Sequence, residues 1–210
     1  APKLGNIVTR LLAVKPLSDL DARFRDMDSV PDYRQVISLP NPALEEIGDA
    51  TTGPELARIA NDEMAELCQK HPDRFVGFAA ALYLGDVEGA ISEAKRAVTQ
   101  LGAKGVLIYN HVGGHPLDEP RFRPFFSAMA ELKRPIWLHP TRTAATSADY
   151  ASESKSRFEM WWCFGWPYDT SIAMSRLVFD GLFDRHPDLE IITHHAGGMI
   201  PFFDGRIGPG

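Results

Sequence analysis

The sequence predicts an α/β fold of the (β/α)8 barrel type, and three observations support this prediction. Short runs rich in β-branched and aromatic residues alternate with longer stretches whose apolar residues recur every three or four positions. Most of the short runs are apolar on both faces, as strands are when helices cover one face of a sheet and a packed interior covers the other. This alternation implies right-handed crossovers and a parallel sheet, which leaves a doubly wound sheet or a barrel. No Gly-x-Gly-x-x-Gly follows the first strand and no phosphate-binding lysine loop occurs, so the barrel is favoured.

Five segments are predicted as strands, because each is a short run of β-branched, aromatic and other apolar residues. In chain order they are QVISL at 35–39, RFVGFAAAL at 74–82, GVLIY at 105–109, PIWLH at 135–139 and LEIITH at 189–194. Helical stretches separate them, so the predicted order of elements is β-α-β-α-β-α-β-α-β.

Each of the four predicted helices has one apolar stripe, which we expect to be buried. The stripes are Leu56, Ile59, Ala60, Met64 and Leu67; Val87, Ala90, Ile91, Ala94, Val98 and Leu101; Phe122, Phe125, Phe126 and Met129; and Met174, Leu177, Val178 and Leu182. Pro54 and Pro120 suit first helical turns and Gly102 suits a helix end, which agrees with these helices.

The composition fits a single soluble globular domain over residues 1–210. Of the 210 residues, 44% are hydrophobic and 24% are charged, which is enough for a sizeable core. The net charge of -6 and the scattered basic residues argue against nucleic acid as a partner. No apolar run approaches the roughly 20 residues that span a bilayer, and the opening APKLGNIVTR has no signal-peptide core, so we expect no membrane association and a cytoplasmic location.

Most of the histidines follow predicted strands, at the end of a barrel where catalytic residues lie. The five at such strand ends are His111, His115, His139, His194 and His195. The other two, His71 and His186, precede proline in turns at the opposite rim, and we expect both to be structural. Imidazole is a common ligand of zinc and a common general acid or base, but a histidine at a strand end can also be a simple polar cap. No His-x-His, His-Glu-x-x-His or carboxylate cluster resolves these alternatives.

Two long segments resemble one known family. They are GVLIYNHVGGHPLDEPRFRPFFSAMAELKRPIWLHP at 105–140 and FGWPYDTSIAMSRLVFDGLFDRHPDLEIITHHAGGMIPFFDGRI at 164–207. Together with LDARFRDMD and YRQVISLPNP nearer the start, they resemble the aminocarboxymuconate-semialdehyde decarboxylase-like branch of the amidohydrolase superfamily. This branch includes resorcylate and related aromatic-acid decarboxylases, along with some hydrolases and hydratases.

The resemblance implies a metal-dependent (β/α)8 barrel and assigns two histidines. His139 resembles the metal-binding histidine at the end of the fifth strand, which coordinates zinc or, alternatively, manganese. His195 resembles the sixth-strand histidine that acts as acid or base beside the metal. Strand alternation points His194 to the opposite face, where we expect it to be structural or to support the site without contacting the substrate. Gly197 and Gly198 are expected to let the main chain approach a bound substrate.

The resemblance also defines what the sequence lacks. Members of the family carry a His-x-His pair on the first strand and a metal-binding aspartate on the eighth, and this sequence has no counterpart of either. The five predicted strands are therefore expected to be strands two to six of the barrel, incomplete at both ends and part of a longer chain.

The implied function is metal-dependent decarboxylation of a small aromatic or muconate-type carboxylic acid, with His195 moving a proton at the reacting carbon. Substrate contacts are predicted for Asn110, His111, Arg142 and Trp166. The Arg142 guanidinium is interpreted as a partner for a carboxylate or, alternatively, as a solvated loop residue. The aromatic group of Trp161, Trp162, Phe164 and Trp166 is interpreted as a substrate wall, as ordinary packing or as a subunit contact. We also expect a homodimer or a higher homo-oligomer.

Two alternative functions stay open at the level of sequence. The first keeps the fold and the metal but uses an activated water to hydrolyse or hydrate a lactone, an amide or an enol acid. The second is a metal-free scaffold without catalytic activity.

Overall fold

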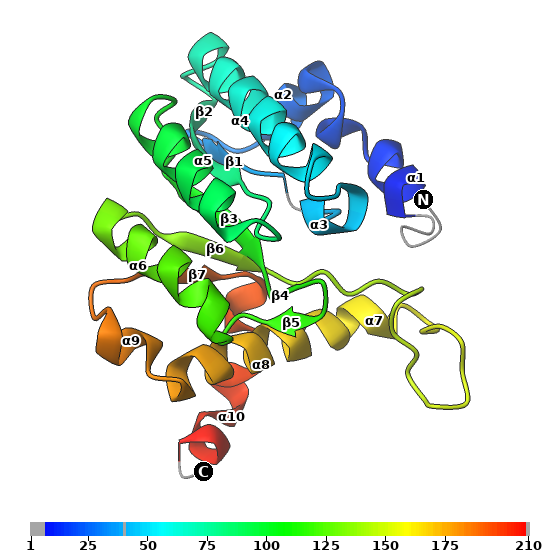
Figure 1. Ribbon diagram of the computed structural model, residues 1–210. Helices are drawn as coiled ribbons and strands as arrows, with labels where there is room; N and C mark the ends of the chain where they lie inside the picture. The colour runs from blue at the N-terminus through cyan, green and yellow to red at the C-terminus, as the bar shows by residue number, and fades with distance from the viewer. Residues whose placement is uncertain (1–6, 40, 209–210) are drawn as a thin grey trace.

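Five parallel strands form one sheet in the computed structural model, which describes residues 7–39 and 41–208 (Figure 1). They are β1 (Gln35–Ile37), β2 (Phe75–Ala81), β3 (Gly105–Tyr109), β6 (Ile136–His139) and β7 (Ile191–Thr193). All five predicted strands are confirmed, and the observed bounds lie within the predicted ranges.

The order of the strands shows how the sheet is wound. Along the sheet they follow one another as β1-β2-β3-β6-β7, each parallel to its neighbours. A doubly wound sheet reverses its strand order at a switch point, and no reversal occurs here. Right-handed crossovers in one direction place the connecting helices on one face. Figure 1 shows α4 (Thr52–Lys70), α5 (Val87–Thr99) and α6 (Arg123–Leu132) side by side over that face. This is the arrangement of half of a barrel rather than that of a doubly wound sheet.

The four predicted helices are present and further helices accompany them. The predicted ones are α4 (Thr52–Lys70), α5 (Val87–Thr99), α6 (Arg123–Leu132) and α8 (Gly165–Phe179). The others are α1 (Ile7–Ala13), η1 (Lys15–Leu17), α2 (Leu20–Asp28), α3 (Leu44–Ile47), η2 (Pro120–Phe122), α7 (Met160–Cys163), α9 (Leu182–Arg185), η3 (His195–Gly197) and α10 (Ile200–Ile207).

Two of the predicted stripes contain residues that are not buried. Ile59 on α4 is 52% exposed and Val178 on α8 is 48% exposed. The last predicted stripe also crosses a helix boundary, because Gly181 adopts a φ of +76° and starts α9 at Leu182. The prediction of burial was wrong for Ile59 and Val178. The prediction of one continuous stripe was wrong at Gly181, because a spacing of three or four residues does not show where a helix ends.

A short antiparallel hairpin follows β3 and was missed by the sequence analysis. It consists of β4 (His111–Val112) and β5 (His115–Pro116). Gly113 and Gly114 form its turn with φ values of +58° and +86°. Paired positive φ angles are typical of a tight two-residue turn, so the two glycines between histidines were the available signal.

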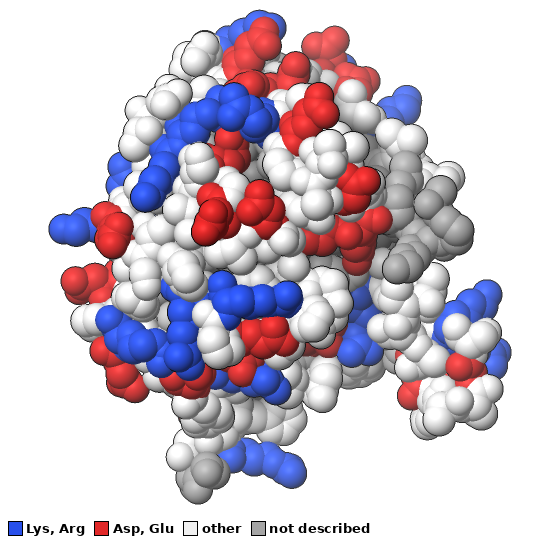
Figure 2. Space-filling model, viewed as in Figure 1, with Lys and Arg blue, Asp and Glu red and all other residues white. Residues whose placement is uncertain are grey.

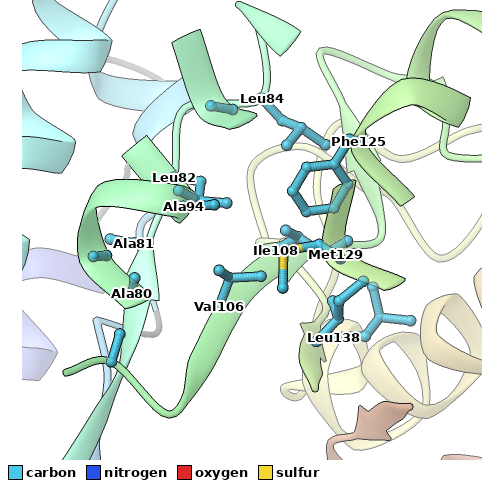
Figure 3. Close-up of a cluster of buried hydrophobic side chains, with 14 of the residues drawn as sticks. Ala80, Ala81, Leu82, Leu84, Ala94, Val106, Ile108, Phe125, Met129 and Leu138 are labelled. Carbon is cyan, nitrogen blue, oxygen red and sulfur yellow. The ribbon is translucent and has the colours of Figure 1, made fainter. Parts of the chain in front are cut away.

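The core lies between the sheet and the helices that cover it (Figure 3). Val106, Ile108 and Leu138 project from the strands toward Phe125 and Met129 of α6, and all five side chains are nearly inaccessible to solvent. Because successive side chains of a strand point to opposite faces, the alternate residues form a separate group on the other face. That smaller group contains Ala43, Ala79, Leu107 and Tyr109, with Trp137 packed against it. His139 lies two residues after Trp137 on β6, so its side chain points to the same second face.

One buried amide joins α4, β2 and α5. The Asn61 side chain is fully buried; its Oδ1 accepts a hydrogen bond from the Ala81 N–H at 2.7 Å and its Nδ2 donates to the Ala81 carbonyl at 2.9 Å. Nδ2 also donates to Glu93 Oε1 at 2.7 Å, and Arg96 holds the same carboxylate. Every polar group in this connection has a partner, as buried polar groups require.

Charged side chains of both signs lie on the face shown in Figure 2. On the face in Figure 2, Lys and Arg side chains are interspersed with Asp and Glu side chains, and neither sign forms a continuous area. Among the described residues, no helix has the length and apolar character that a membrane span needs. Most of the opening segment used for the signal-peptide prediction, residues 1–6, lies outside the described residues.

We expect Asn61→Ala to lower the free energy of unfolding by about 2 to 4 kcal/mol, because it leaves two buried main-chain groups of Ala81 without partners. Urea unfolding followed by circular dichroism measures this loss. Gln69→Ala, at an exposed position on the same helix, is the control and should change the value by less than about 0.5 kcal/mol. Equal effects of the two substitutions would contradict the structural role of the amide.

Candidate active site

Three imidazole rings converge at the carboxyl ends of β6 and β7. His139 is the last residue of β6, and His194 and His195 follow the last residue of β7. The ring centroid of His139 lies 4.6 Å from that of His194 and 5.5 Å from that of His195, and the latter two are 6.1 Å apart. The structure thus brings together the predicted metal ligand and the predicted acid or base.

His139 is buried and its orientation is fixed by a main-chain carbonyl. Its Nδ1 lies 2.6 Å from the Pro140 oxygen, which can only accept, so Nδ1 carries the proton. The side-chain amide of Asn41 lies 3.4 Å from the same nitrogen. Burial, with smaller contributions from His194 and His195, lowers the pKa of His139 to about 3. The ring is therefore neutral near pH 7, with its free lone pair on Nε2.

His194 does not point away from the site, so that part of the sequence analysis was wrong. Its Nδ1 donates a hydrogen bond to the Leu138 carbonyl at 2.8 Å, and this bond turns the ring toward His139. Strand alternation failed as an argument because β7 ends at Thr193. Beyond that residue the chain no longer alternates.

His195 opens the short helix η3 with an unusual φ of +55°. Its ring is exposed and lies 5.3 Å from the indole of Trp166, tilted by 36°. Partial burial and the neighbouring His194 lower the pKa of the ring. An accessible imidazole beside a buried one is an arrangement suited to proton transfer.

Of the two glycines after His195, Gly198 packs closely against α8. A Cβ on Gly198 would lie 2.5 Å from the Pro167 oxygen and 2.8 Å from Ser171 Oγ. The Met199 N–H donates to the same Ser171 hydroxyl at 2.7 Å. The sequence analysis gave close approach to substrate as the reason for these glycines, whereas close approach to α8 is what the geometry shows for Gly198.

The predicted substrate contacts Asn110 and His111 form hydrogen bonds within the chain. Asn110 Oδ1 accepts from the Thr141 N–H at 3.0 Å. His111 Nδ1 accepts from the Gly114 N–H at 3.2 Å, and its Nε2 lies 3.1 Å from Thr141 Oγ1. Burial lowers the pKa of His111, so the ring is neutral near pH 7.

Arg142 already has a carboxylate partner. Its Nε and one terminal nitrogen donate to the two carboxylate oxygens of Asp169 on α8, at 3.0 and 2.8 Å. This bidentate pair raises the pKa of the guanidinium further above its ordinary value. Substrate binding by Arg142 stays a prediction, with Asp169 as an internal competitor that the sequence did not reveal.

Trp166 forms a wall beside the histidines. Its ring lies 5.2 Å from His139 as well as 5.3 Å from His195, and its Nε1 donates to the Arg142 carbonyl at 2.8 Å. Trp161 is buried behind it at 5.4 Å, while Trp162 and Phe164 are exposed. The aromatic group therefore divides into a site residue, a packing residue and two surface residues.

The remaining histidines lie apart from this cluster. His115 is exposed in the hairpin and contacts Glu119 at 2.9 Å. His71 follows the last residue of α4, and its ring meets that of Phe24 edge-on. His186 follows the last residue of α9 and contacts Ser127 at 3.3 Å. The expectation that His71 and His186 are structural agrees with these contacts.

Two further groups at the site were missed. Asn41 follows the first predicted strand and lies near His139. Tyr109 ends the third predicted strand and is paired with His139 on the neighbouring strand, with ring centroids 6.1 Å apart. The Tyr109 hydroxyl donates to the Leu39 carbonyl at 3.1 Å, and burial raises the pKa of the phenol. Their position at strand ends was the available signal.

The donor set suits a divalent cation in its chemistry. Metal-bound imidazoles commonly donate their other nitrogen to a carbonyl, as both His139 and His194 do. A neutral ring with its lone pair on Nε2 needs no proton release to bind. Over residues 7–39 and 41–208, however, no group of three or more His, Cys, Asp or Glu side chains is arranged to hold an ion. Of the described residues, His139 and His194 have the chemistry of metal ligands, and they would make up only part of a coordination sphere.

Comparison with known proteins shows similarity along nearly the whole chain. Residues 13–206 match the family model described as Amidohydrolase. The chain is 36% identical to gamma-resorcylate decarboxylase of Rhodococcus jostii, covering 93% of this chain and 61% of that protein. It is 31% identical to 2-amino-3-carboxymuconate-6-semialdehyde decarboxylase of Dictyostelium discoideum, covering 73% of this chain and 41% of that protein. The chain thus spans about three fifths of the length of the first of these relatives.

A solved structure gives the same result for the fold. A dihydroxybenzoic acid decarboxylase from a Polaromonas species, with bound manganese and the inhibitor 2-nitroresorcinol, superimposes with a TM-score of 0.80 at 32% identity. The similarity covers 90% of this chain and 58% of that one.

We expect Gly198→Ala to destabilise the protein more than Gly197→Ala. Both residues have positive φ, which costs an alanine roughly 1 to 2 kcal/mol, but only at Gly198 does the new Cβ collide with α8. The overlap should add at least about 1 kcal/mol to the loss in free energy of unfolding, measured in urea. Equal losses for the two variants would show that η3 is not held against α8 in this way.

Proposed function

The chain belongs to the amidohydrolase family, in the branch of the resorcylate and aminocarboxymuconate-semialdehyde decarboxylases, and we propose that it carries out metal-dependent decarboxylation of a small hydroxylated aromatic acid. The observation that carries this proposal is the pairing of a buried imidazole, His139, with an accessible one, His195, against the same indole of Trp166. Decarboxylase relatives of similar sequence over nine tenths of the chain support it.

The five strands are proposed to correspond to strands two to six of a (β/α)8 barrel. The sequential order of the sheet and the placement of its long helices on one face support this correspondence. On this basis His139 ends the fifth strand and His195 follows the sixth, which places both at the carboxyl end of the barrel.

His139 would hold a divalent metal ion, manganese or zinc, through Nε2. The solved relative with bound manganese supports manganese in particular. An ion bound there supplies Lewis-acid stabilisation of negative charge on the carboxylate and the neighbouring phenol oxygen of the substrate. His194, 4.6 Å from His139, limits the space on one side of that nitrogen.

His195 would deliver the proton. Protonation of the ring carbon that bears the carboxylate interrupts the aromatic system, the bond to the carboxylate then breaks, and its electron pair restores the aromatic ring as carbon dioxide leaves. A protonated imidazole within reach of that carbon is a suitable donor and is left neutral after the transfer. Trp166 provides a flat apolar surface beside His195, against which a planar acid can stack.

The partner is therefore proposed to be a small aromatic carboxylic acid. A homodimer or higher oligomer is proposed as well, because Trp162 and Phe164 expose aromatic rings next to the site.

We expect the manganese-loaded protein to release carbon dioxide from 2-hydroxybenzoates, with 2,6-dihydroxybenzoate as the first compound to test. A second oxygen beside the carboxylate allows chelation, so 3- and 4-hydroxybenzoate serve as controls and should react much more slowly. Carbon dioxide is measured with a coupled enzyme assay, and the phenol by chromatography. Turnover of lactones or amides in place of carbon dioxide release would favour the hydrolytic alternative.

We expect His139→Ala and His195→Asn to separate metal binding from proton transfer. His139→Ala should lose stoichiometric manganese, measured by elemental analysis after dialysis. His195→Asn should keep the metal and lower kcat by about 10²- to 10⁴-fold, the usual effect of removing a general acid. A His195→Asn variant with full activity would remove this residue from the proposed reaction.

A further inference from the structure

We propose that Asn110 and His111 are positioning residues: they hold the main chain at Thr141 and thereby fix the orientation of the metal-binding ring of His139. The inference rests on the proposed function, because it concerns His139 as a metal ligand. It replaces the direct substrate contacts predicted for these two residues from the sequence.

The Pro140 carbonyl and the Thr141 N–H belong to one peptide unit. The Pro140 carbonyl accepts the hydrogen bond from His139 Nδ1 at 2.6 Å. The nitrogen of the same peptide unit is that of Thr141, and the unit is planar, so the carbonyl cannot turn unless the N–H turns with it. That N–H donates to Asn110 Oδ1 at 3.0 Å. Asn110 therefore holds one end of the peptide whose other end holds His139.

The side chain of Thr141 is buried and is held by His111. The Gly114 N–H donates to His111 Nδ1 at 3.2 Å, so in the neutral ring the proton is on Nε2. Nε2–H then donates to Thr141 Oγ1 at 3.1 Å. The turn at Gly113 and Gly114 brings the donor N–H back to the ring, which gives the small hairpin a structural purpose.

The register of β3 and β6 provides a further attachment. Tyr109 pairs with His139, and the Asn110 N–H donates to the His139 carbonyl at 3.1 Å. The main chain that follows the His139 Cα is consequently tied to residues 110 and 111. With three attachments on two consecutive peptides, the Nε2 lone pair has one preferred direction.

The consequence for metal binding follows from how outer hydrogen bonds act. Groups that orient a metal-bound histidine typically contribute 10- to 100-fold to affinity for the ion. Asn110→Ala should weaken binding of Mn²⁺ alone by about this factor, since the peptide at Pro140 can then rotate and release Nδ1 of His139.

Conservative substitutions separate positioning from general stability. His111→Asn keeps an acceptor near the place of Nδ1 but removes the donor to Thr141, whereas His111→Gln keeps a donor near the place of Nε2. Thr141→Val removes the hydroxyl at nearly constant shape, and Thr141→Ser retains it. We expect weaker metal binding for His111→Asn and Thr141→Val and near-normal binding for His111→Gln and Thr141→Ser.

The experiment titrates each full-chain variant with Mn²⁺ by calorimetry and with Co²⁺ by visible absorption, which reports ligand geometry independently of activity. Urea unfolding is measured on the same samples. The double variant His111→Asn with Thr141→Val should bind Mn²⁺ no more weakly than either single variant, because both substitutions remove the same hydrogen bond.

Normal affinity and an unchanged Co²⁺ spectrum in Asn110→Ala, together with loss of binding in His139→Ala, would overturn the positioning role and leave the proposed function intact. Unchanged binding in both variants would overturn the metal site, and with it the proposed function and this inference. If Asn110→Ala does not fold, the comparison of Thr141→Val with Thr141→Ser decides in the same way.

Discussion

The parallel pairing of β3 with β6 is the interaction on which the site depends. It aligns Tyr109 with His139, so both strands end at the same level and the residues that follow them face one another. Asn110 then continues the ladder through its N–H to the His139 carbonyl. A shift of one residue would turn His139 to the helix-covered face of the sheet, where a polar ring has no partner. The hydrophobic core enforces the register, because Ile108 and Leu138 are buried together under α6 only in this alignment.

The helix α8 provides the second half of the site. It begins at Gly165, against which the Arg142 side chain packs, and its first turn carries Trp166. Further along the same helix, Ser171 receives the Met199 N–H and so holds the turn that carries His195. One helix therefore contacts the chain after β6 and the chain after β7. This explains how two histidines more than fifty residues apart reach the same indole ring.

The sequence predicted β2, β3 and β6 well because most of their residues are buried, and burial leaves a dense apolar pattern. The less buried β1 and β7 were predictable from their β-branched residues. The sequence predicted the position of His139 as well, since β6 ends there. Features set by main-chain geometry beyond the strands were not predictable from periodicity. His194 is the clearest case: its direction depends on where β7 stops and on a bond to the Leu138 carbonyl, neither of which has a periodic signature. The pairing of Arg142 with Asp169 was likewise hidden, because the two residues are 27 positions apart and in different elements.

The use of hydrogen-bonding capacity separates the polar residues of this rim into two groups. Asn110, His111 and Arg142 each use at least one side-chain polar atom in a hydrogen bond within the chain. In His139 and His194, one nitrogen donates to a carbonyl and the other keeps a lone pair. Residues of the first group cost free energy to redirect toward a ligand, because each would leave a partner unsatisfied. Residues of the second group can bind an ion without breaking any internal bond. On the proposed function, the histidines at the ends of β6 and β7 carry the chemistry of the rim, and the end of β3 and its hairpin hold them in place.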